Sequence, residues 1–104
     1  MTGDKTMQSN VLHLVFSAGQ GAFEACRAAS TAGDSVLFVD NGVRQLLLGE
    51  PGKWLPPGVA VYYSGPDLEA RGLASPAREL QLRILKDAAF PSLLQNHQHC
   101  LSWK

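Results

Sequence analysis

Charge and cysteine are scarce in this sequence. Charged side chains make up 17% of the 104 residues, and nine Lys plus Arg balance nine Asp plus Glu. Basic residues nowhere cluster with interleaved aromatics, so direct nucleic-acid binding has no electrostatic basis. No apolar run is long enough to cross a bilayer, and the opening MTGDKTMQSN lacks the apolar stretch of a secretion signal. We therefore expect a cytoplasmic protein that contacts neither nucleic acid nor membrane directly.

The two cysteines, Cys26 and Cys100, are expected to be free thiols, because a reducing compartment disfavours a disulfide. His97, His99 and Cys100 offer three metal-ligand side chains close together. A tetrahedral zinc site needs a fourth ligand, and no CxxC or HExxH pattern supplies one. We expect no metal, and we interpret this segment as a solvated helix end whose carbonyl groups favour partial positive charge.

A hydrophobic content of 45% is typical of a folded globule, and the length fits one domain. We assign residues 1–10 to a flexible lead and residues 11–104 to the domain. Short apolar segments rich in β-branched residues predict strands at 11–16, 35–39, 59–63, 82–85 and 99–103, the last as an edge strand. The segment RELQLRILK also fits one face of a helix.

Helical segments between these strands imply parallel pairing, since parallel neighbours need crossover connections. The expected fold is a small doubly wound, Rossmann-like α/β domain with helices on both faces. The first helix is predicted at 22–32, ending at Gly33, with Phe23 and Cys26 buried. Glu24 and Arg27 are predicted to form an ion pair on its outer face.

Turn-forming residues predict further boundaries. Asp67 is expected to cap a short helix that Gly72 ends, and Asp87 to cap a last helix with Pro91 in its first turn. The VRQLLL segment is either a short helical turn or extended. After Asp40, the Asn-Gly pair 41–42 predicts a turn with positive φ.

Tryptophans are expected to anchor two segments. The loop 49–58 is dense in Gly and Pro, and Trp54 is its only large anchor. Trp103 is expected to pack into the core or into an interface, because a large aromatic near a chain end otherwise frays.

Two segments are candidate sites. SAGQG, between the first strand and the first helix, has backbone N–H groups that could cradle a phosphate, but it lacks the Lys of a P-loop and the third glycine of a dinucleotide fingerprint. A plain turn that lets the helix pack closely is the alternative. Cys26 is either a reactive thiol or a small buried hydrophobe, because a mid-helix position offers little help from the helix dipole.

Four motifs occur in this sequence: LH in the first strand, GDSVLFVDNGV, VYYSGPDLEARGL, and Trp103 preceded by an apolar and a small residue. In combination they resemble the TusB/DsrH family, the smallest subunits of the TusBCD and DsrEFH sulfur-relay complexes. The resemblance spans about 11–103, and PDLEARGL with the spacing from Phe90 to Trp103 is its most specific part. It departs from the family in the first loop, where SAGQG replaces a common Ser-Pro pair, and at Asn41, where Asp is usual.

The resemblance implies a small α/β domain with a parallel sheet, assembled in a heterohexamer with TusC/TusD-like or DsrE/DsrF-like subunits. Such complexes pass persulfide sulfur from a carrier protein toward 2-thiolation of the tRNA wobble uridine, or exchange it with a carrier during sulfur oxidation. The established carrier cysteine lies on the TusD or DsrE type of subunit. Cys26 nevertheless falls where Dsr-type members carry a cysteine, and His97 matches a histidine of some Tus-type members.

We therefore expect an accessory subunit without cofactor and without activity of its own, with Cys26 as a candidate sulfur acceptor. The alternatives are a stand-alone thiol-dependent sulfurtransferase that uses Cys26, and a small nucleotide-binding domain that uses SAGQG.

Overall fold

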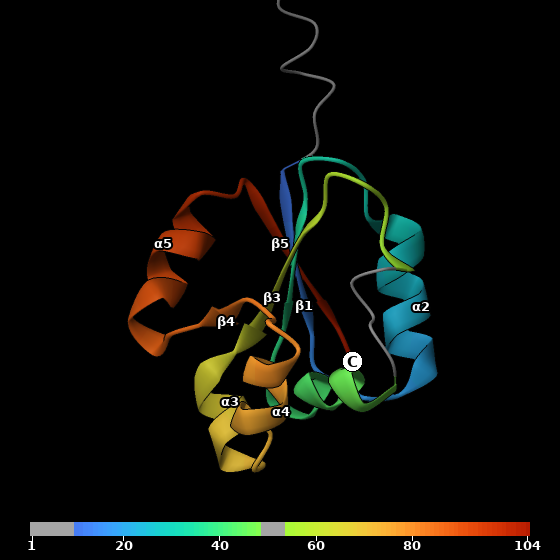
Figure 1. The fold of residues 1–104 in the computed structure, drawn as a ribbon. Coiled ribbons are helices and arrows are strands. Elements are labelled where there is room, and N and C mark those ends of the chain that lie inside the picture. The colour runs from blue at the N-terminus through green and yellow to red at the C-terminus, as the bar shows by residue number, and fades with distance from the viewer. Residues whose placement is uncertain (1–9, 49–53) are drawn as a thin grey trace, which may run out of the picture.

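A five-stranded, all-parallel sheet forms the centre of the computed structural model, which describes residues 10–48 and 54–104 (Figure 1). The strand order is β4-β3-β2-β1-β5. The strands are β1 (Val11–Val15), β2 (Ser35–Phe38), β3 (Ala60–Ser64), β4 (Ile84–Leu85) and β5 (His99–Trp103). The predicted Rossmann-like α/β fold is confirmed, and each expected strand is present with small shifts of its ends.

Helices cover both faces of the sheet (Figure 1). The chain steps from β1 to β4 in one direction and then crosses back to place β5 beside β1, so right-handed crossovers put the last connection on the opposite face. Accordingly α2 (Gln20–Ala29) covers one face and α5 (Phe90–Gln95) the other. The 3₁₀ helix η1 (Asp40–Leu48), α3 (Gly65–Ala70) and α4 (Ala74–Glu79) lie near the carboxyl ends of the strands, and the 3₁₀ turn η3 (Asp87–Ala89) precedes α5.

Alternation along the strands divides the core into two layers. On the α2 side, Phe23 and Cys26 pack against the strand residues Val15, Val36 and Phe38. The α5-side layer is smaller and consists of Leu12, Leu37 and Leu93, with partly buried neighbours such as Phe90. Burial of these side chains is the main force holding the helices on the sheet.

The first helix is displaced from its predicted position at 22–32. It begins at Gln20 and ends at Ala29, before Gly33. The Ser30 hydroxyl donates to the Cys26 carbonyl at 2.6 Å, and the Thr31 N–H donates to the Asp34 carboxylate at 3.1 Å. These side-chain bonds replace the next helical bonds and stop the helix early. The predicted ion pair is present, with 2.7 Å between Arg27 Nη2 and Glu24 Oε1.

The predicted helix caps are wrong at two places. Ser64, not Asp67, is the N-cap of α3, and its hydroxyl accepts from the Asp67 N–H at 3.4 Å. Asp87 lies in the turn η3 rather than at the N-cap of α5, although Pro91 does fall in the first turn of that helix. The helix α4 was not predicted, because its short sequence ASPARE has no clear apolar periodicity.

The turn after β2 also differs from the prediction. Positive φ occurs at Asp40, with a value of 51°, and the VRQLLL segment continues as the 3₁₀ helix η1. Gly42 is required for a different reason: a Cβ there would lie 1.9 Å from the Val15 carbonyl oxygen.

The loop before β3 is anchored by Leu55 rather than by Trp54. Leu55 is 7% exposed, whereas Trp54 is 56% exposed. The rest of the predicted loop, 49–53, and nearly all of the predicted lead, 1–9, lie outside the described residues. Among the helices in the described part of the chain, none combines the length and the hydropathy that a membrane span requires.

Candidate functional site

Cys26 lies inside the molecule, on the face of α2 that packs against the sheet. Its side chain is fully buried, and its sulfur lies 3.7 Å from the Ser30 hydroxyl oxygen. Burial raises the pKa of the Cys26 thiol, the Ser30 hydrogen bond opposes this, and the negative charge of Asp34 raises the pKa further. The protonated thiol is therefore favoured, whereas sulfur transfer needs a thiolate.

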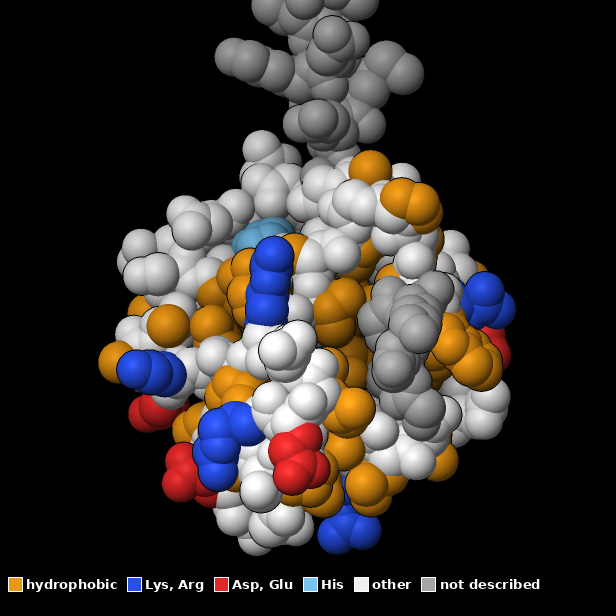
Figure 2. All heavy atoms as spheres, in the orientation of Figure 1, with side chains coloured by type: hydrophobic (Ala, Val, Ile, Leu, Met, Phe, Trp, Pro, Cys, Tyr) orange, Lys and Arg blue, Asp and Glu red, His pale blue; other side chains and the backbone are white. Residues whose placement is uncertain are grey.

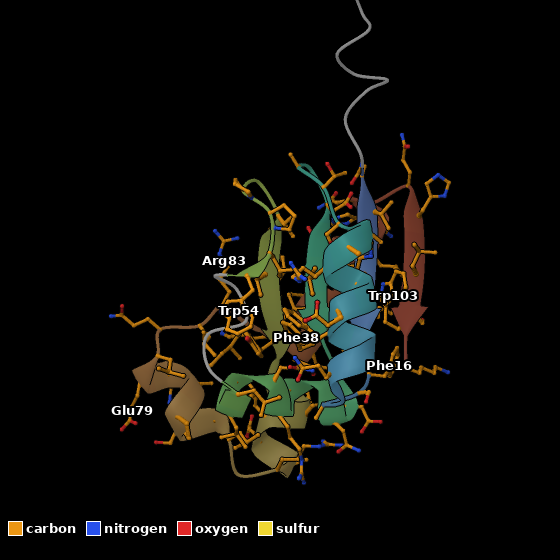
Figure 3. All side chains as sticks on the ribbon, turned by 90° about the vertical axis from the view of Figure 1, so that its right-hand side faces the viewer. Phe16, Phe38, Trp54, Glu79, Arg83 and Trp103 are labelled. Atoms are coloured by element: carbon orange, nitrogen blue, oxygen red, sulfur yellow. The ribbon has the colours of Figure 1, made fainter. Side chains whose placement is uncertain are left out.

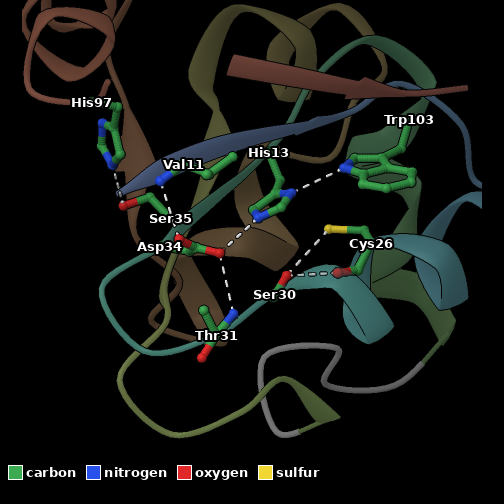
Figure 4. Close-up of polar contacts among 9 residues, drawn as sticks. All are labelled: Val11, His13, Cys26, Ser30, Thr31, Asp34, Ser35, His97 and Trp103. Atoms are coloured by element: carbon green, nitrogen blue, oxygen red, sulfur yellow. Dashed lines mark hydrogen bonds and ion pairs between the residues drawn. The ribbon is translucent and has the colours of Figure 1, made fainter. Parts of the chain in front are cut away.

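Asp34, just before β2, is the centre of the polar network beside Cys26 (Figure 4). Its carboxylate accepts from the Val11 N–H at 3.1 Å and from the Thr31 N–H at 3.1 Å. The same carboxylate lies 2.9 Å from Nε2 of His13, and both side chains are 1% exposed. A buried carboxylate with several donors is electrostatically satisfied, so Asp34 fixes the start of β1, the start of β2 and the turn after α2 together.

Trp103 completes this network from β5. Its indole Nε1–H donates to Nδ1 of His13 at 3.0 Å, and the ring centroids lie 6.0 Å apart with an interplanar angle of 27°. An indole nitrogen can only donate, so Nδ1 of His13 carries no proton and Nε2–H donates to Asp34. His13 is thus a neutral imidazole with both nitrogens occupied. The expectation that Trp103 docks is met: it packs at the edge of the α2-side core.

The occupied imidazole determines what this cluster can do chemically. A cysteine nucleophile paired with a histidine needs a ring nitrogen free to take the thiol proton. Figure 4 shows Cys26 and His13 in one cluster, but the two ring nitrogens of His13 face Asp34 and Trp103. In this conformation the cluster holds β1, β2, β5 and α2 together and does not activate the thiol.

His13 and Asp34 lie in the motifs LH and GDSVLFVDNGV, but neither residue was assigned a role from the sequence. Neither residue shows an obvious sign of function in the sequence. His13 is one polar residue within an apolar strand, and Asp34 is next to Gly33 in an expected turn. The usable clue was the buried polar position itself, because a histidine in the middle of a buried strand needs partners.

Of the three side chains for which we expected no metal, His97 lies between α5 and β5, and His99 and Cys100 lie on β5. Nδ1 of His97 lies 2.7 Å from the Leu93 carbonyl and Nε2 lies 2.8 Å from the Ser35 hydroxyl, so His97 ties α5 to β2. His99 and Cys100 are exposed on β5, and partial burial raises the pKa of the Cys100 thiol. Within residues 10–48 and 54–104, no group of three or more His, Cys, Asp or Glu side chains could hold a metal ion. Both cysteines are free thiols.

The second candidate segment, SAGQG, lies at the carboxyl end of β1. Its first three residues line an open hollow of about 560 Å³. The other residues that line this hollow are Phe16, Asn41 and Arg44. The Gly19 N–H is already bonded to the Ser17 hydroxyl at 2.9 Å, and the Gln45 side chain donates to the Ser17 carbonyl at 3.2 Å. These bonds describe a tightly held turn, in agreement with the plain-turn alternative.

The polar residues of α3 fix the neighbouring loop. The Arg71 guanidinium forms an ion pair with Asp40, and its Nε–H donates to the Asn41 side chain at 3.0 Å. The Asp67 carboxylate accepts from the Asp40 N–H at 2.8 Å. Asp67 and Arg71 of the PDLEARGL motif therefore hold the turn after β2, where Asp40 has its positive φ.

No protein-family model matches the chain, and no curated protein matches it. Of the features singled out in the sequence, the fold brings Cys26 and Trp103 to the His13–Asp34 cluster, and it leaves SAGQG and His97 in separate places.

Proposed function

We propose that the chain is an accessory subunit of a cytoplasmic sulfur-relay complex, one that transfers persulfide sulfur for 2-thiolation of the tRNA wobble uridine or in the related Dsr sulfur-oxidation pathway. The proposal starts from the resemblance of residues 11–103 to the TusB/DsrH family. The parallel α/β sheet agrees with the fold that this resemblance implies. Its partners are TusC/TusD-like or DsrE/DsrF-like subunits, with a sulfur-carrier protein reached through the complex.

The observation that favours an accessory role is the state of Cys26. Its thiol is fully buried, its pKa is raised by burial, and both nitrogens of the nearby His13 are engaged. A thiol that takes up sulfur must be accessible and ionised when the donor arrives. The isolated chain meets neither condition at Cys26, so the chemistry belongs to a partner or begins only after a partner has bound.

The surface offers apolar contacts to such partners. Large hydrophobic side chains with at least two fifths of their surface exposed are Leu47, Leu48, Trp54, Leu80, Leu94 and Leu101. Hydrophobic side chains also extend over the face seen in Figure 2, between scattered Lys, Arg, Asp and Glu. Leu48 and Trp54 line one hollow together, and adjoining exposed apolar side chains are typical of surfaces that bind other proteins.

If Cys26 accepts sulfur in the complex, the step is a simple exchange. The Cys26 thiol loses its proton to solvent, and its thiolate attacks the outer sulfur of a donor persulfide. The donor S–S bond breaks, a new S–S bond forms at Cys26, and the donor leaves as a thiolate. Neither metal nor redox cofactor is required, but α2 has to move to expose the sulfur.

Co-expression with candidate partner subunits tests this proposal. Native mass spectrometry should detect the chain in a complex with them, and mass measurement after incubation with glutathione persulfide should detect loading of Cys26 only in that complex. Peptide mapping should then show that Cys26→Ser abolishes the sulfur adduct on the α2 peptide, whereas Cys100→Ser, an exposed control, should leave that adduct unchanged. A chain that ignores all such partners would contradict the accessory role; assembly with loading unaffected by Cys26→Ser would leave Cys26 purely structural.

A stand-alone thiol-dependent sulfurtransferase using Cys26 is the alternative. It would need His13 or another base to accept the thiol proton, and His13 is committed to Asp34 and Trp103. This geometry makes the alternative the weaker of the two.

A further inference from the structure

Strand β5 is an open edge of the sheet. Among residues 10–48 and 54–104 it pairs only with β1, and Figure 3 shows it at the margin of the sheet, with none of the described helices or strands beyond it. The opposite edge is different, because β4 has two residues, Ile84–Leu85, and the charged residues Arg83 and Lys86 flank it. The longer strand β5 is therefore the edge on which another strand has room to pair.

The outward-facing backbone groups of β5 follow from its pairing with β1. The Phe16 N–H donates to the Trp103 carbonyl at 2.9 Å, so the backbone of Trp103 points toward β1. In a parallel ladder the N–H and C=O of one residue point to the same side, and successive residues alternate. The N–H and C=O groups of Cys100 and Ser102 therefore point away from β1, toward the open edge.

This edge lacks the features that usually protect one. Natural edge strands carry charges, proline or bulges that prevent pairing with other chains. Residues 99–103 contain no proline and no Lys, Arg, Asp or Glu. The adjacent charge is Lys104, but its ammonium lies 5.5 Å from the centroid of the Phe16 ring in its own chain. It is thus turned toward β1 instead of across the edge.

We propose that β5 pairs antiparallel with β5 of a second copy of this chain, joining two five-stranded sheets into one continuous sheet. The backbone argues for a second copy, because the groups that face outward are complementary to themselves. Cys100 of one chain can exchange both N–H···O bonds with Ser102 of the second copy, and Ser102 with its Cys100. The two-fold axis then passes beside Leu101, as an isologous interface requires.

The side chains fit the same register. Leu101 is 45% exposed and comes to lie directly opposite Leu101 of the second copy, in a pair that has no backbone bonds between its members and brings side chains close together. His99 comes to lie opposite Trp103 of the second copy. Formal neutrality of the chain removes long-range repulsion between the copies. This interface does not depend on the proposed role in sulfur relay.

Charge reversal at the axis tests the pairing. Sedimentation equilibrium of the wild-type chain should give the mass of a dimer. Leu101→Lys and Leu101→Glu should each be monomeric, because like charges would face each other across the axis, and an equimolar mixture of the two variants should recover the dimer. Leu94→Lys is the matched control: Leu94 is 41% exposed on α5, and its substitution should leave the dimer intact.

Cross-linking tests the register independently. In the Cys100→Ser background, Leu101→Cys should form an intermolecular disulfide under mild oxidation, because directly opposite residues have Cα atoms about 4.5 to 5.5 Å apart, within disulfide reach. The wild-type Cys100 should not, since its counterpart lies diagonally across the axis. Circular dichroism of each variant checks that the fold is retained.

A monomeric wild-type chain would overturn the proposal, including the case in which β5 pairs only with a different protein. A dimer that survives both charge variants would equally overturn it, as would a disulfide that forms through Cys100 but not through Leu101→Cys.

Discussion

Trp103 and His13 are ninety positions apart, yet the indole Nε1–H of Trp103 donates to Nδ1 of His13 at 3.0 Å. This bond attaches the last strand to the first and leaves the imidazole no free nitrogen, since Nε2 faces Asp34. The same contact therefore stabilises the sheet and prevents His13 from acting as a base for Cys26.

Replacing Trp103 with Phe should destabilise the protein by about 1 to 3 kcal/mol, because Nδ1 of the buried His13 loses its donor. Urea unfolding followed by circular dichroism measures the change. Trp54→Phe is the control, since Trp54 is largely exposed and its loss should change the free energy of unfolding by less than about 0.5 kcal/mol. Equal stability of the two variants would mean that the Trp103–His13 bond contributes nothing.

Asp34→Ala should cost more than about 3 kcal/mol, because it removes the acceptor of the Val11 and Thr31 N–H groups and of His13 together. Asp87→Ala removes an exposed carboxylate and should be nearly neutral. The comparison is again a pair of urea unfolding curves. If the free energy of unfolding of Asp34→Ala were within about 1 kcal/mol of that of Asp87→Ala, the network would contribute little to stability.

Two glycines should respond to alanine in opposite directions. Gly42→Ala places a Cβ 1.9 Å from the Val15 carbonyl oxygen, so the backbone must shift, at a cost of about 1 to 3 kcal/mol. Gly21 lies in α2 with no atom within 4 Å of its added Cβ, and alanine there should stabilise the helix by up to about 1 kcal/mol. Thermal unfolding of both variants measures the signs. A stabilising Gly42→Ala would contradict the close approach of η1 to β1.

Cys26 should react with iodoacetamide far more slowly than Cys100 in the native protein, because the Cys26 thiol is fully buried whereas Cys100 is exposed. Peptide mass mapping after short exposures separates the two sites. Denaturation in urea should make their rates similar. Equal rates in the native state would show that α2 opens readily in the isolated chain.

The raised pKa of Cys26 also predicts the pH dependence of stability. A folded pKa above the unfolded value gives a contribution that is complete below the unfolded thiol pKa, about 8.5, and lost as pH rises through the folded value. The free energy of unfolding should therefore fall more steeply with pH above about 8.5 in the wild type than in Cys26→Ala. Burial raises the pKa of Tyr63 as well, so the comparison belongs below about pH 10, where Tyr begins to ionise in the unfolded chain.

Sequence patterns predicted the sheet well because buried parallel strands require apolar runs, and the segments 11–16 and 35–39 are such runs. They placed helix ends poorly. Ser30 and Ser64 decide where α2 stops and α3 starts, and each competes with an equally suitable Gly or Asp nearby. Such choices depend on tertiary contacts that local propensity does not contain.

The polar cluster around His13 and Asp34 could not be predicted from the sequence for a related reason. Cys26 and Trp103 were recognisable as unusual residues, but their connection runs through His13 and Asp34, which come together only when β5 returns beside β1. Sequence separation hides such a network even when two of its members are recognisable.

Sulfur transfer by the isolated chain is the most direct test of the accessory role. Purified protein incubated with thiosulfate or glutathione persulfide, with cyanide as acceptor, should produce no thiocyanate above the rate of Cys26→Ser, because the Cys26 thiol is buried and lacks a base. Turnover by the wild-type chain alone, abolished by Cys26→Ser, would contradict the account and establish the chain as an enzyme in its own right.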